Sequence, residues 1–308
     1  MKKKNTNKKI HNDPISIIST GKLGSNLALA LQNSKYIIKS VHSRNKLQRD
    51  WLLKNLDPKI IITDNINKAV ENSKYIFLTT TDSSLKKVSQ KINWKNDQVA
   101  IHFSGALPLS ILDHVKKNNA KTGTIHPLQT FPSKSNYKNL YNIPYAIESD
   151  DEEVFTWIIN LINFFNGKAI NISSNSRELY HAAAVYSCAL LSGLIATAAE
   201  MLKSLNLERD EAVEVLLPLI KTTLEAISTT GIPKSITGPY IRGDVNTIKS
   251  HISALEQYNP KISLAYNALA FASMEIFNEE KILSDSVYNE INTNLIKSIK
   301  KTLDCYKK

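Results

Sequence analysis

The spacing of hydrophobic residues changes about half-way along the chain. From residue 14 to about 173, short apolar runs rich in β-branched residues alternate with amphipathic stretches. The runs predict strands at residues 15–19, 37–41, 60–63, 75–79, 98–103, 122–125, 145–147 and 168–172. The helices predicted between them include residues 51–55, 84–92, 109–118 and 152–165. This alternation predicts an α/β fold of the Rossmann-like type, a doubly wound and mostly parallel sheet.

Strand signals almost vanish after residue 174, where long helical patterns take over. The predicted helices are residues 176–205, 208–228, 245–258, 260–277 and 284–304. We therefore expect a sheet domain at residues 14–172 and an all-α domain at residues 173–308. Residues 1–13 are basic and polar, and we expect them to form a disordered tail.

The first predicted strand ends in a glycine turn that favours a dinucleotide site. A helix that starts directly after a strand presents backbone N–H groups and its positive end to a pyrophosphate. Ser19 stands where the G-x-G-x-x-G pattern has its first glycine, Gly21 leaves room for close backbone approach, and Gly24 permits tight helix–strand packing. The residues expected to contact the cofactor here are Gly21, Lys22, Leu23 and Gly24.

The second predicted strand is followed by Ser43 and Arg44, where an NAD site would carry an acidic residue. A hydroxyl and a guanidinium are the donors that a 2′-phosphate needs, which favours NADP(H). The alternative is an ordinary polar turn with a solvated arginine. After the fourth strand, Thr80 and Thr81 are expected to contact the cofactor; Asp82 or Ser83 alternatively caps the next helix.

Two further strands end in residues with the right chemistry for a reductase. Ser104 follows the fifth strand, and His126 follows the sixth, immediately before a proline that stiffens its loop. Histidine can supply the proton when a carbonyl or imine accepts hydride. We predict that His126 is catalytic and that Ser104 and Gln129 bind substrate, although a single histidine beside proline is more often structural.

The helical half contributes the remaining candidates. Tyr180 and His181 share a helix face with Arg177, because the spacings are three and four. We predict that His181 is a second catalytic residue; the alternative is a histidine hydrogen-bonded in the core. Asp244 is placed to cap a following helix, which leaves Arg242 to bind an anionic substrate group.

Composition narrows the class of partner. The net charge of +11 is concentrated at the two ends and otherwise scattered over lysines, so we expect no nucleic-acid binding. The two cysteines form no C-x-x-C pair and no paired-carboxylate or zinc-ligand spacing occurs, so we expect no metal and a cytoplasmic protein.

One segment has the length of a membrane span. Residues 182–199 are uncharged, but they are rich in alanine and serine and poor in large aliphatic residues. We expect a buried helix between domains or between two copies of a homodimer, and no membrane insertion.

Four motifs carry a resemblance to a known group. They are HFSGA at 102–106, HPLQTF at 126–131, YHAAAV at 180–185 and TGPYIRGD at 237–244. Together they resemble Rossmann-like proteins with a DUF2520 C-terminal domain, whose N-terminal half is similar to the F420-dependent NADP oxidoreductase and pyrroline-5-carboxylate reductase families. The resemblance implies an NADP-binding domain followed by a helical domain of the 6-phosphogluconate dehydrogenase type, often dimer-forming. Ala189 departs from it, since the group has asparagine there.

Two functions remain open from the sequence. The first is an NADP(H)-dependent reductase acting on a small anionic keto acid or imine, which His126, His181 and Arg242 favour. The second is a non-catalytic NADP(H)-binding sensor or scaffold, which Ser19 and Ala189 favour.

Overall fold

The structure is a computed structural model and describes residues 13–306. The expected disordered tail therefore lies, apart from residue 13, outside the described residues. The chain forms two compact units that divide between Leu190 and Leu191. The division lies later than the expected residue 172 because α7 (Arg177–Val185) belongs to the first unit, where its side chains bond to the sheet.

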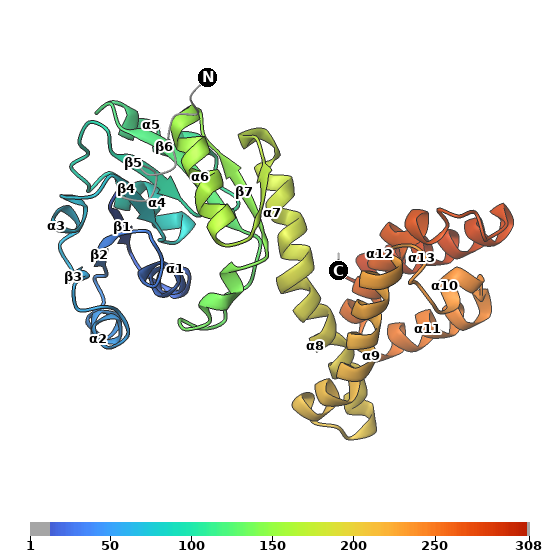
Figure 1. The fold of residues 1–308 in the computed structure, drawn as a ribbon. Coiled ribbons are helices and arrows are strands. Elements are labelled where there is room, and N and C mark those ends of the chain that lie inside the picture. Colours follow the sequence, from blue (N-terminus) through green and yellow to red (C-terminus); the bar gives the residue numbers. More distant parts are fainter. Residues whose placement is uncertain (1–12, 307–308) are drawn as a thin grey trace. The chain divides into compact units, whose positions relative to one another are not determined.

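The first unit contains one eight-stranded sheet in the order β3-β2-β1-β4-β5-β6-β7-β8. All neighbouring strands are parallel except the antiparallel pair β6 and β7. The expected doubly wound, mostly parallel sheet is confirmed (Figure 1). The strands are β1 (Ile15–Ile18), β2 (Ile38–His42), β3 (Ile61–Thr63), β4 (Tyr75–Leu78), β5 (Val99–His102), β6 (Lys121–Pro127), β7 (Pro144–Glu148) and β8 (Lys168–Asn171).

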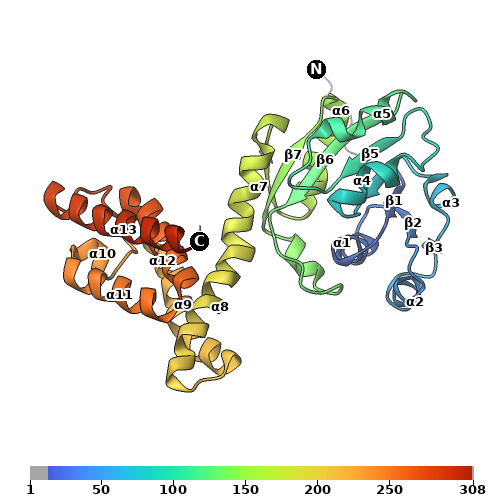
Figure 2. The ribbon, with the colours of Figure 1, turned by 180° about the vertical axis from the view of Figure 1, so that it is seen from behind.

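Successive side chains of the central strands enter two different cores, which explains the unbroken apolar runs. In β4, Tyr75 and Phe77 join one core, whereas Ile76 and Leu78 join the other. A strand covered on both faces needs apolar residues at every position. The first core is built with α1 (Lys22–Gln32), α2 (Lys46–Asn55) and α6 (Glu152–Phe164). The second is built with α3 (Ile66–Val70), α4 (Asp82–Ser89) and α5 (Asp113–Lys116) (Figures 1 and 2).

Side chains that cap the first turn determine where several helices begin. The helix α2 begins at Lys46, five residues before the predicted start, because the Asn45 side chain accepts the backbone N–H of Gln48. Asp151 caps α6 in the same way through the N–H of Val154. Thr81, and not Asp82 or Ser83, occupies the cap position of α4, although its side chain makes no capping bond.

Several turns are closed by asparagines with left-handed backbone. Asn119 follows α5, Asn166 follows α6 and Asn206 follows the 3₁₀ segment Leu202–Leu205; their φ angles are 56°, 50° and 61°. Asn142, with φ 60°, precedes β7. Asparagine is the non-glycine residue that adopts this conformation most readily.

The second unit is all-helical, as expected. Its helices are α8 (Leu191–Met201), α9 (Arg209–Thr230), α10 (Pro239–Arg242), α11 (Val245–Tyr258), α12 (Pro260–Phe277) and α13 (Asp285–Cys305). Ile248, Met274 and Ile291 are fully buried and join α11, α12 and α13 in one core. Asp244 caps α11 by accepting the N–H of Thr247 at 3.1 Å, as the sequence predicts.

The predicted long helix after residue 174 is present but interrupted. It consists of a 3₁₀ turn at Ser174–Ser176, α7, a π-helical segment at Tyr186–Leu190, α8 and a 3₁₀ turn at Leu202–Leu205. Ser174–Leu205 is long and apolar enough for a membrane span by length and composition, and 6% of its most apolar window is buried. The chain leaves this segment largely exposed, so its packing against a second copy stays a prediction.

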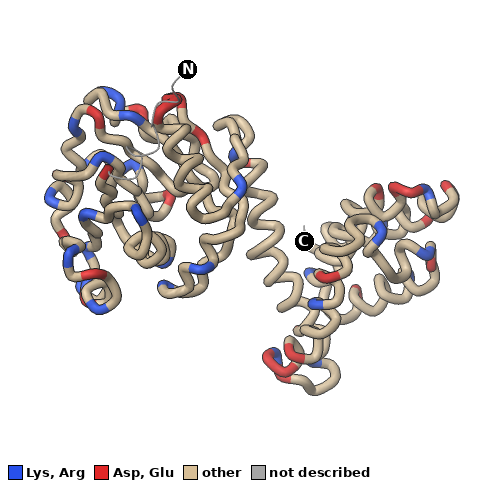
Figure 3. Tube along the Cα trace, viewed as in Figure 1, with Lys and Arg blue, Asp and Glu red and all other residues tan. Residues whose placement is uncertain are grey.

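Charged residues are dispersed over both units. Both basic and acidic residues occur in each unit, and the helical run through α7 and α8 carries few of either (Figure 3). Residues 1–12, which hold five of the lysines, lie outside the described residues, so the expected absence of nucleic-acid binding stays a prediction.

Candidate functional site

The turn after β1 follows the path of a dinucleotide-binding loop although it lacks the first glycine. Ser19 adopts φ 63°, the left-handed conformation that glycine favours. Its N–H donates to Nδ1 of His42 at 3.3 Å, and the N–H of Thr20 donates to the His42 carbonyl at 3.1 Å. Burial lowers the pKa of His42, which keeps its ring neutral and able to accept. The neighbouring strand β2 therefore holds Ser19 in the required conformation.

The two remaining glycines perform different tasks. A Cβ at Gly24 would collide with Thr79 and lie 3.0 Å from the Thr20 methyl group, so the packing role expected of Gly24 is confirmed. A Cβ at Gly21 would meet nothing within 4 Å, so its surroundings are open. Gly21, at the N-cap of α1, has no side chain to bond to the first-turn N–H groups of Lys22, Leu23 and Gly24. An anion can approach them directly.

A pocket of about 190 Å³ adjoins this turn at the ends of β2 and β3. Arg44 and Lys91 supply positive charge, while Ile66 and Val88 supply apolar walls. Ser19, His42 and Asp64 complete the lining. Asp64 is paired with Arg49 at 3.2 Å, which offsets its negative charge. These residues fit the adenosine end of a phosphorylated dinucleotide, because they combine two cations with an apolar slot.

The other residues that the sequence predicts to contact the cofactor are Ser43, Thr80 and Thr81. Ser43 is 4% exposed, and its hydroxyl accepts the N–H of Asn45 at 3.3 Å, so it shapes the turn that presents Arg44. Thr80 and Thr81 follow β4 at the same sheet edge, and the hydroxyls of Thr81 and Ser83 are 3.3 Å apart. The structure therefore brings Arg44 to a pocket, whereas the Ser43 hydroxyl serves the loop.

The rings of His126 and His181 both lie close to Gly105, in the turn that follows β5. A Cβ at Gly105 would lie 2.7 Å from Nδ1 of His181 and 2.8 Å from Nε2 of His126. The two rings are 6.0 Å apart between centroids. Nδ1 of His126 is hydrogen-bonded to the Tyr180 hydroxyl at 2.7 Å. The structure thus brings together both histidines that the sequence predicts to be catalytic.

The surroundings of His126 keep its imidazole neutral. Burial lowers its pKa to about 4, and the nearby His181 and the Arg177 guanidinium add to the effect. Burial also lowers the pKa of the neighbouring His102, to about 3. Burial raises the pKa of the Tyr180 phenol to about 12. At neutral pH the phenol is therefore protonated and His126 carries no charge.

A buried ion pair fixes α7 to the sheet below these rings. The Arg177 side chain is fully buried, and its Nε donates to Glu148 of β7 at 3.0 Å. Its Nη1 donates to the Ser104 carbonyl at 3.3 Å. Nη2 of Arg177 and Nδ1 of His181 have no hydrogen-bond partner among the described residues. Unpaired buried nitrogens of this kind are rare and suit a site that receives a ligand.

A pocket of about 410 Å³ opens beside the histidines. His126, Tyr180 and His181 form its polar wall, and Gln129 and Thr130 extend that wall along the loop after β6. The remaining lining residues come from α7, the π-helical segment and the loop; they are Leu128, Ala183, Ala184, Val185, Ser187, Cys188 and Ala189. π-helical segments are frequent at functional sites. The pocket is mostly apolar with a few convergent polar groups, as small-molecule sites are.

The predicted substrate-binding residues are distributed differently. Gln129 lines the pocket. The Ser104 hydroxyl accepts the N–H groups of Ala106 and Leu107 at 3.2 and 3.0 Å, so it shapes the turn before Gly105 and keeps only its own proton to donate. Arg242 lies at the end of α10 in the second unit. It stays a predicted anion-binding residue.

Sequence reasoning did not assign roles to Gly105, Glu148, Arg177 and Tyr180. The spacing of Arg177 and Tyr180 on one helix face was a usable signal, because it placed both beside His181. Glu148 gave no local signal, since it becomes a partner only when β7 lies against α7.

Two family models match the chain. A Rossmann-like domain matches residues 1–127, and DUF2520, a domain of unknown function, matches residues 143–273. The chain is a Rossmann-like protein with a DUF2520 domain. A comparison with curated protein sequences gives no match.

Solved structures agree with this assignment. Protein BF3122 from Bacteroides fragilis, described as a candidate NADP oxidoreductase, is 27% identical with a TM-score of 0.68, and the match covers 86% of this chain and 99% of that one. Protein TM1727 from Thermotoga maritima is 21% identical with a TM-score of 0.68 over 87% and 99%. A 1-pyrroline-5-carboxylate reductase from Streptococcus pyogenes is 15% identical with a TM-score of 0.56 over 94% and 99%. The matches to TM1727 and to the Streptococcus pyogenes reductase show that the fold is shared.

Proposed function

We propose that this protein is an NADP(H)-dependent reductase of a small carbonyl or imine compound. The observation that carries the proposal is the convergence of His126 and His181 over Gly105, on the same sheet edge as the uncapped start of α1. Ligands of doubly wound sheets bind at this edge, outside the carboxyl ends of the strands. The names of the solved relatives, an NADP oxidoreductase and a pyrroline-carboxylate reductase, support the same class.

The residues present fit NADP(H). The α1 amides would hold the pyrophosphate, and Arg44 with Lys91 would hold the 2′-phosphate. When bound, NADPH would supply hydride to the substrate carbon. His126 and His181 would position the polarised oxygen or nitrogen of the substrate, and the apolar walls of the 410 Å³ pocket would exclude water.

The substrate is expected to be a small anionic keto acid or cyclic imine. This part of the proposal depends on Arg242, whose guanidinium suits a carboxylate. Gln129 in the pocket would add a neutral hydrogen-bonding group to the same substrate. The substrate class therefore needs its own test, separate from the test of cofactor binding.

Cofactor binding is tested by fluorescence titration with NADPH and NADH. NADPH is expected to bind more tightly, and Arg44→Ala to weaken NADPH binding about tenfold or more, because it removes a charge-assisted hydrogen bond worth roughly 1.5–3 kcal/mol. NADH affinity should barely change. Arg209→Ala, a surface arginine of α9, is the matched control. Equal affinity of the unaltered protein for both cofactors would overturn the NADP(H) assignment.

Activity is tested by NADPH oxidation at 340 nm with three probes. 1-Pyrroline-5-carboxylate is an anionic imine, pyruvate is an anionic keto acid, and 1-pyrroline is a neutral imine. Turnover of either anionic probe, reduced by Arg242→Ala, supports the proposed substrate class. Turnover of 1-pyrroline alone supports the reductase and overturns the anionic part.

A non-catalytic NADP(H)-binding sensor is the second candidate. Ala189 lines the pocket where the group carries asparagine, which removes a polar contact from that wall. Ser19 no longer favours this alternative, because it adopts the glycine conformation. Tight NADPH binding without oxidation of any probe would favour the sensor.

We also propose a cytoplasmic homodimer, formed through the exposed apolar helices. Leu194 of α8 and Leu219 and Leu224 of α9 are about half exposed or more. A second copy covering these helices would bury well above about 1,200 Å². Light scattering at micromolar concentration is expected to give twice the mass of 34.5 kDa, and a monomer would contradict the proposal.

A further inference from the structure

Tyr180 has no role in the sequence-based prediction, yet it is hydrogen-bonded to His126 beside the pocket. Its hydroxyl is 2.7 Å from Nδ1 of His126, and the two rings meet edge to face at 5.6 Å between centroids. Both side chains line the 410 Å³ pocket. The other nitrogen of His126, Nε2, is directed at Gly105 and away from the phenol. The phenol and the imidazole therefore form a hydrogen-bonded pair with one end in the pocket.

We infer that Tyr180 is the catalytic residue that gives the proton to the substrate, and that His126 restores it. The inference rests on the proposed reductase activity. The O–H bond of Tyr180 breaks and its proton goes to the substrate oxygen or nitrogen, as the adjoining carbon gains hydride. The phenolate takes the Nδ1 proton of His126 while Nε2 takes one from solvent. Nε2 then returns a proton to solvent and Nδ1 gains one, which restores the starting tautomer, so each turnover consumes one solvent proton.

The electrostatics of the pocket agree with this division of roles. Around His126 the titratable or charged groups are Tyr180, His181 and Arg177 from α7, His102 from β5 and, paired with Arg177, Glu148 from β7. With a pKa of about 4, His126 is not an imidazolium at neutral pH and has no extra proton to give. Tyr180, with a pKa of about 12, keeps its proton until the substrate develops negative charge.

The arrangement also requires one tautomer of His126. If Nδ1 carries hydrogen, it donates to the Tyr180 oxygen and leaves the phenol hydrogen free for the substrate. If Nε2 carries it, the phenol must donate to Nδ1 and cannot face the pocket. The tautomer therefore separates a catalytic tyrosine from a structural one.

The first experiment uses the full-length protein without substrate. Nitrogen-15 NMR of the histidine rings is expected to show His126 neutral from pH 5 to 8 with hydrogen on Nδ1. Tyr180→Phe should shift the Nδ1 signal, whereas Tyr186→Phe should not, because Tyr186 is 62% exposed on the same helical run and does not line the pocket. An Nε2–H tautomer, or titration of His126 near pH 6.5, would overturn the inference.

The second experiment measures NADPH binding and turnover of 1-pyrroline-5-carboxylate. Tyr180→Phe is expected to lower kcat about 100-fold or more with the NADPH Kd unchanged, while Tyr186→Phe leaves both unchanged. Tyr180→Phe with normal kcat would overturn the inference and leave the proposed function standing. An unaltered protein that binds NADPH but reduces none of the three probes would instead overturn the proposed function, and the inferred proton transfer with it.

Discussion

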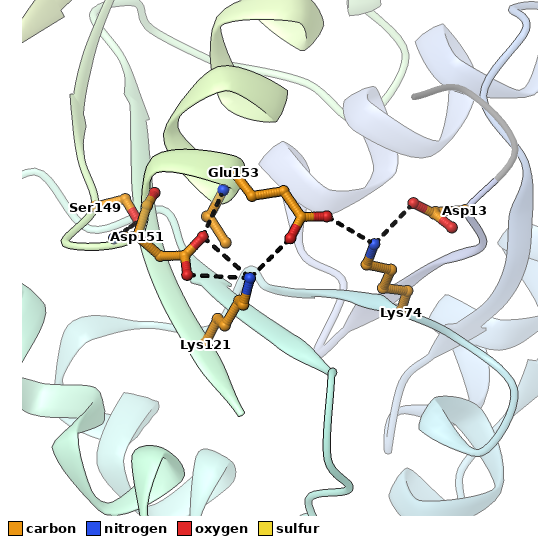
Figure 4. A network of polar contacts seen from close by, with 7 residues as sticks. Asp13, Lys74, Lys121, Ser149, Asp151 and Glu153 are labelled. Atoms are coloured by element: carbon orange, nitrogen blue, oxygen red, sulfur yellow. Dashed lines mark hydrogen bonds and ion pairs between the residues drawn. The ribbon is translucent and has the colours of Figure 1, made fainter. Parts of the chain in front are cut away.

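The polar side chains at the amino edge of the sheet are paired with one another, whereas several at the carboxyl edge have no partner. At the amino ends of β4 and β6, Lys74 and Lys121 join Asp13, Asp151 and Glu153 in a continuous ion-pair network (Figure 4). At the carboxyl ends of β5 and β6, His102 and His126 are neutral, and three buried nitrogens lack partners among the described residues: Nε2 of His102, Nη2 of Arg177 and Nδ1 of His181. Groups that are fully paired hold a fold together, whereas groups left unpaired suit a ligand.

The network at the amino edge is compact and mutually stabilising. Lys121 Nζ lies 2.8 Å from Glu153 and 3.0 Å from Asp151, and Lys74 Nζ lies 3.1 Å from Asp13 and 3.3 Å from Glu153. Lys121 lowers the pKa of the Glu153 carboxyl, and Glu153 in turn raises the pKa of the lysine. The lysines and carboxylates of this network are therefore all paired with one another, and none is left free to bind or react with a ligand.

The largest expected effect comes from breaking the buried pair at the carboxyl edge. Glu148→Gln leaves the fully buried Arg177 without its counter-charge, so we expect the free energy of unfolding to fall by about 3 kcal/mol or more. Urea unfolding followed by circular dichroism measures it. Glu178→Gln, an exposed glutamate in the first turn of α7, is the control and should change stability by a few tenths of a kcal/mol, about the size of a helix-dipole effect. A loss below about 1 kcal/mol for Glu148→Gln would contradict a role for the pair in fixing α7.

A smaller effect is expected from pH. The pKa values of His102 and His126 are lower in the folded chain than the usual 6.5, so between their folded values and pH 6.5 the unfolded chain binds more protons. Stability therefore falls as pH decreases below 6.5, by up to about 2 kcal/mol per histidine at pH 5. Urea unfolding at pH 7 and pH 5 measures the difference.

His126→Asn should flatten this pH dependence, because the amide does not titrate. The carboxylates of the amino edge give the contrast: the pKa values of Asp151 and Glu153 are lowered, so their contribution is lost only as pH falls toward and below about 4. Equal stability of the unaltered protein at pH 7 and pH 5 would show that the buried histidines are not neutral.

The smallest effect is expected at the amino edge. Lys121→Met breaks two ion pairs, but the side chains of Lys121, Asp151 and Glu153 are 32%, 29% and 63% exposed. Exposed pairs contribute about 0–1 kcal/mol each, and salt screens them. The loss in Tm should therefore shrink between about 0.05 M and 0.5 M NaCl. Lys117→Met, which changes an exposed lysine of the same region, is the control. If the loss in Tm of Lys121→Met did not depend on the salt concentration, the Lys121 side chain would stabilise the fold through packing more than through charge.

Much of the fold followed from local pattern. The strands were predictable because apolar runs such as that of β4 are buried on both faces, and α6 because Asp151 precedes a clear amphipathic run. The start of α2 was missed because Asn45 caps a helix whose first five residues are polar except for the exposed Leu47. When polar residues follow a cap, the sequence lacks the hydrophobic periodicity by which a helix is recognised.

The site was less predictable, since it depends on contacts between distant residues. His126 and His181 were identified by type, but their convergence needs Gly105 from a third segment. Tyr180 and His126 are 54 residues apart, and no spacing rule links them. Ser104 was assigned to substrate from its place after a strand, whereas its hydroxyl is bonded to its own turn. Side-chain direction within a turn is fixed by the folded backbone.

The asparagine turns have a consequence for the gene. The chain has 9 glycines in 308 residues, and at Asn119, Asn142, Asn166 and Asn206 asparagine adopts the left-handed backbone that glycine usually fills. Glycine codons begin with two guanines, whereas asparagine codons begin with two adenines. The fold can thus keep its tight turns while its coding sequence becomes rich in adenine and thymine.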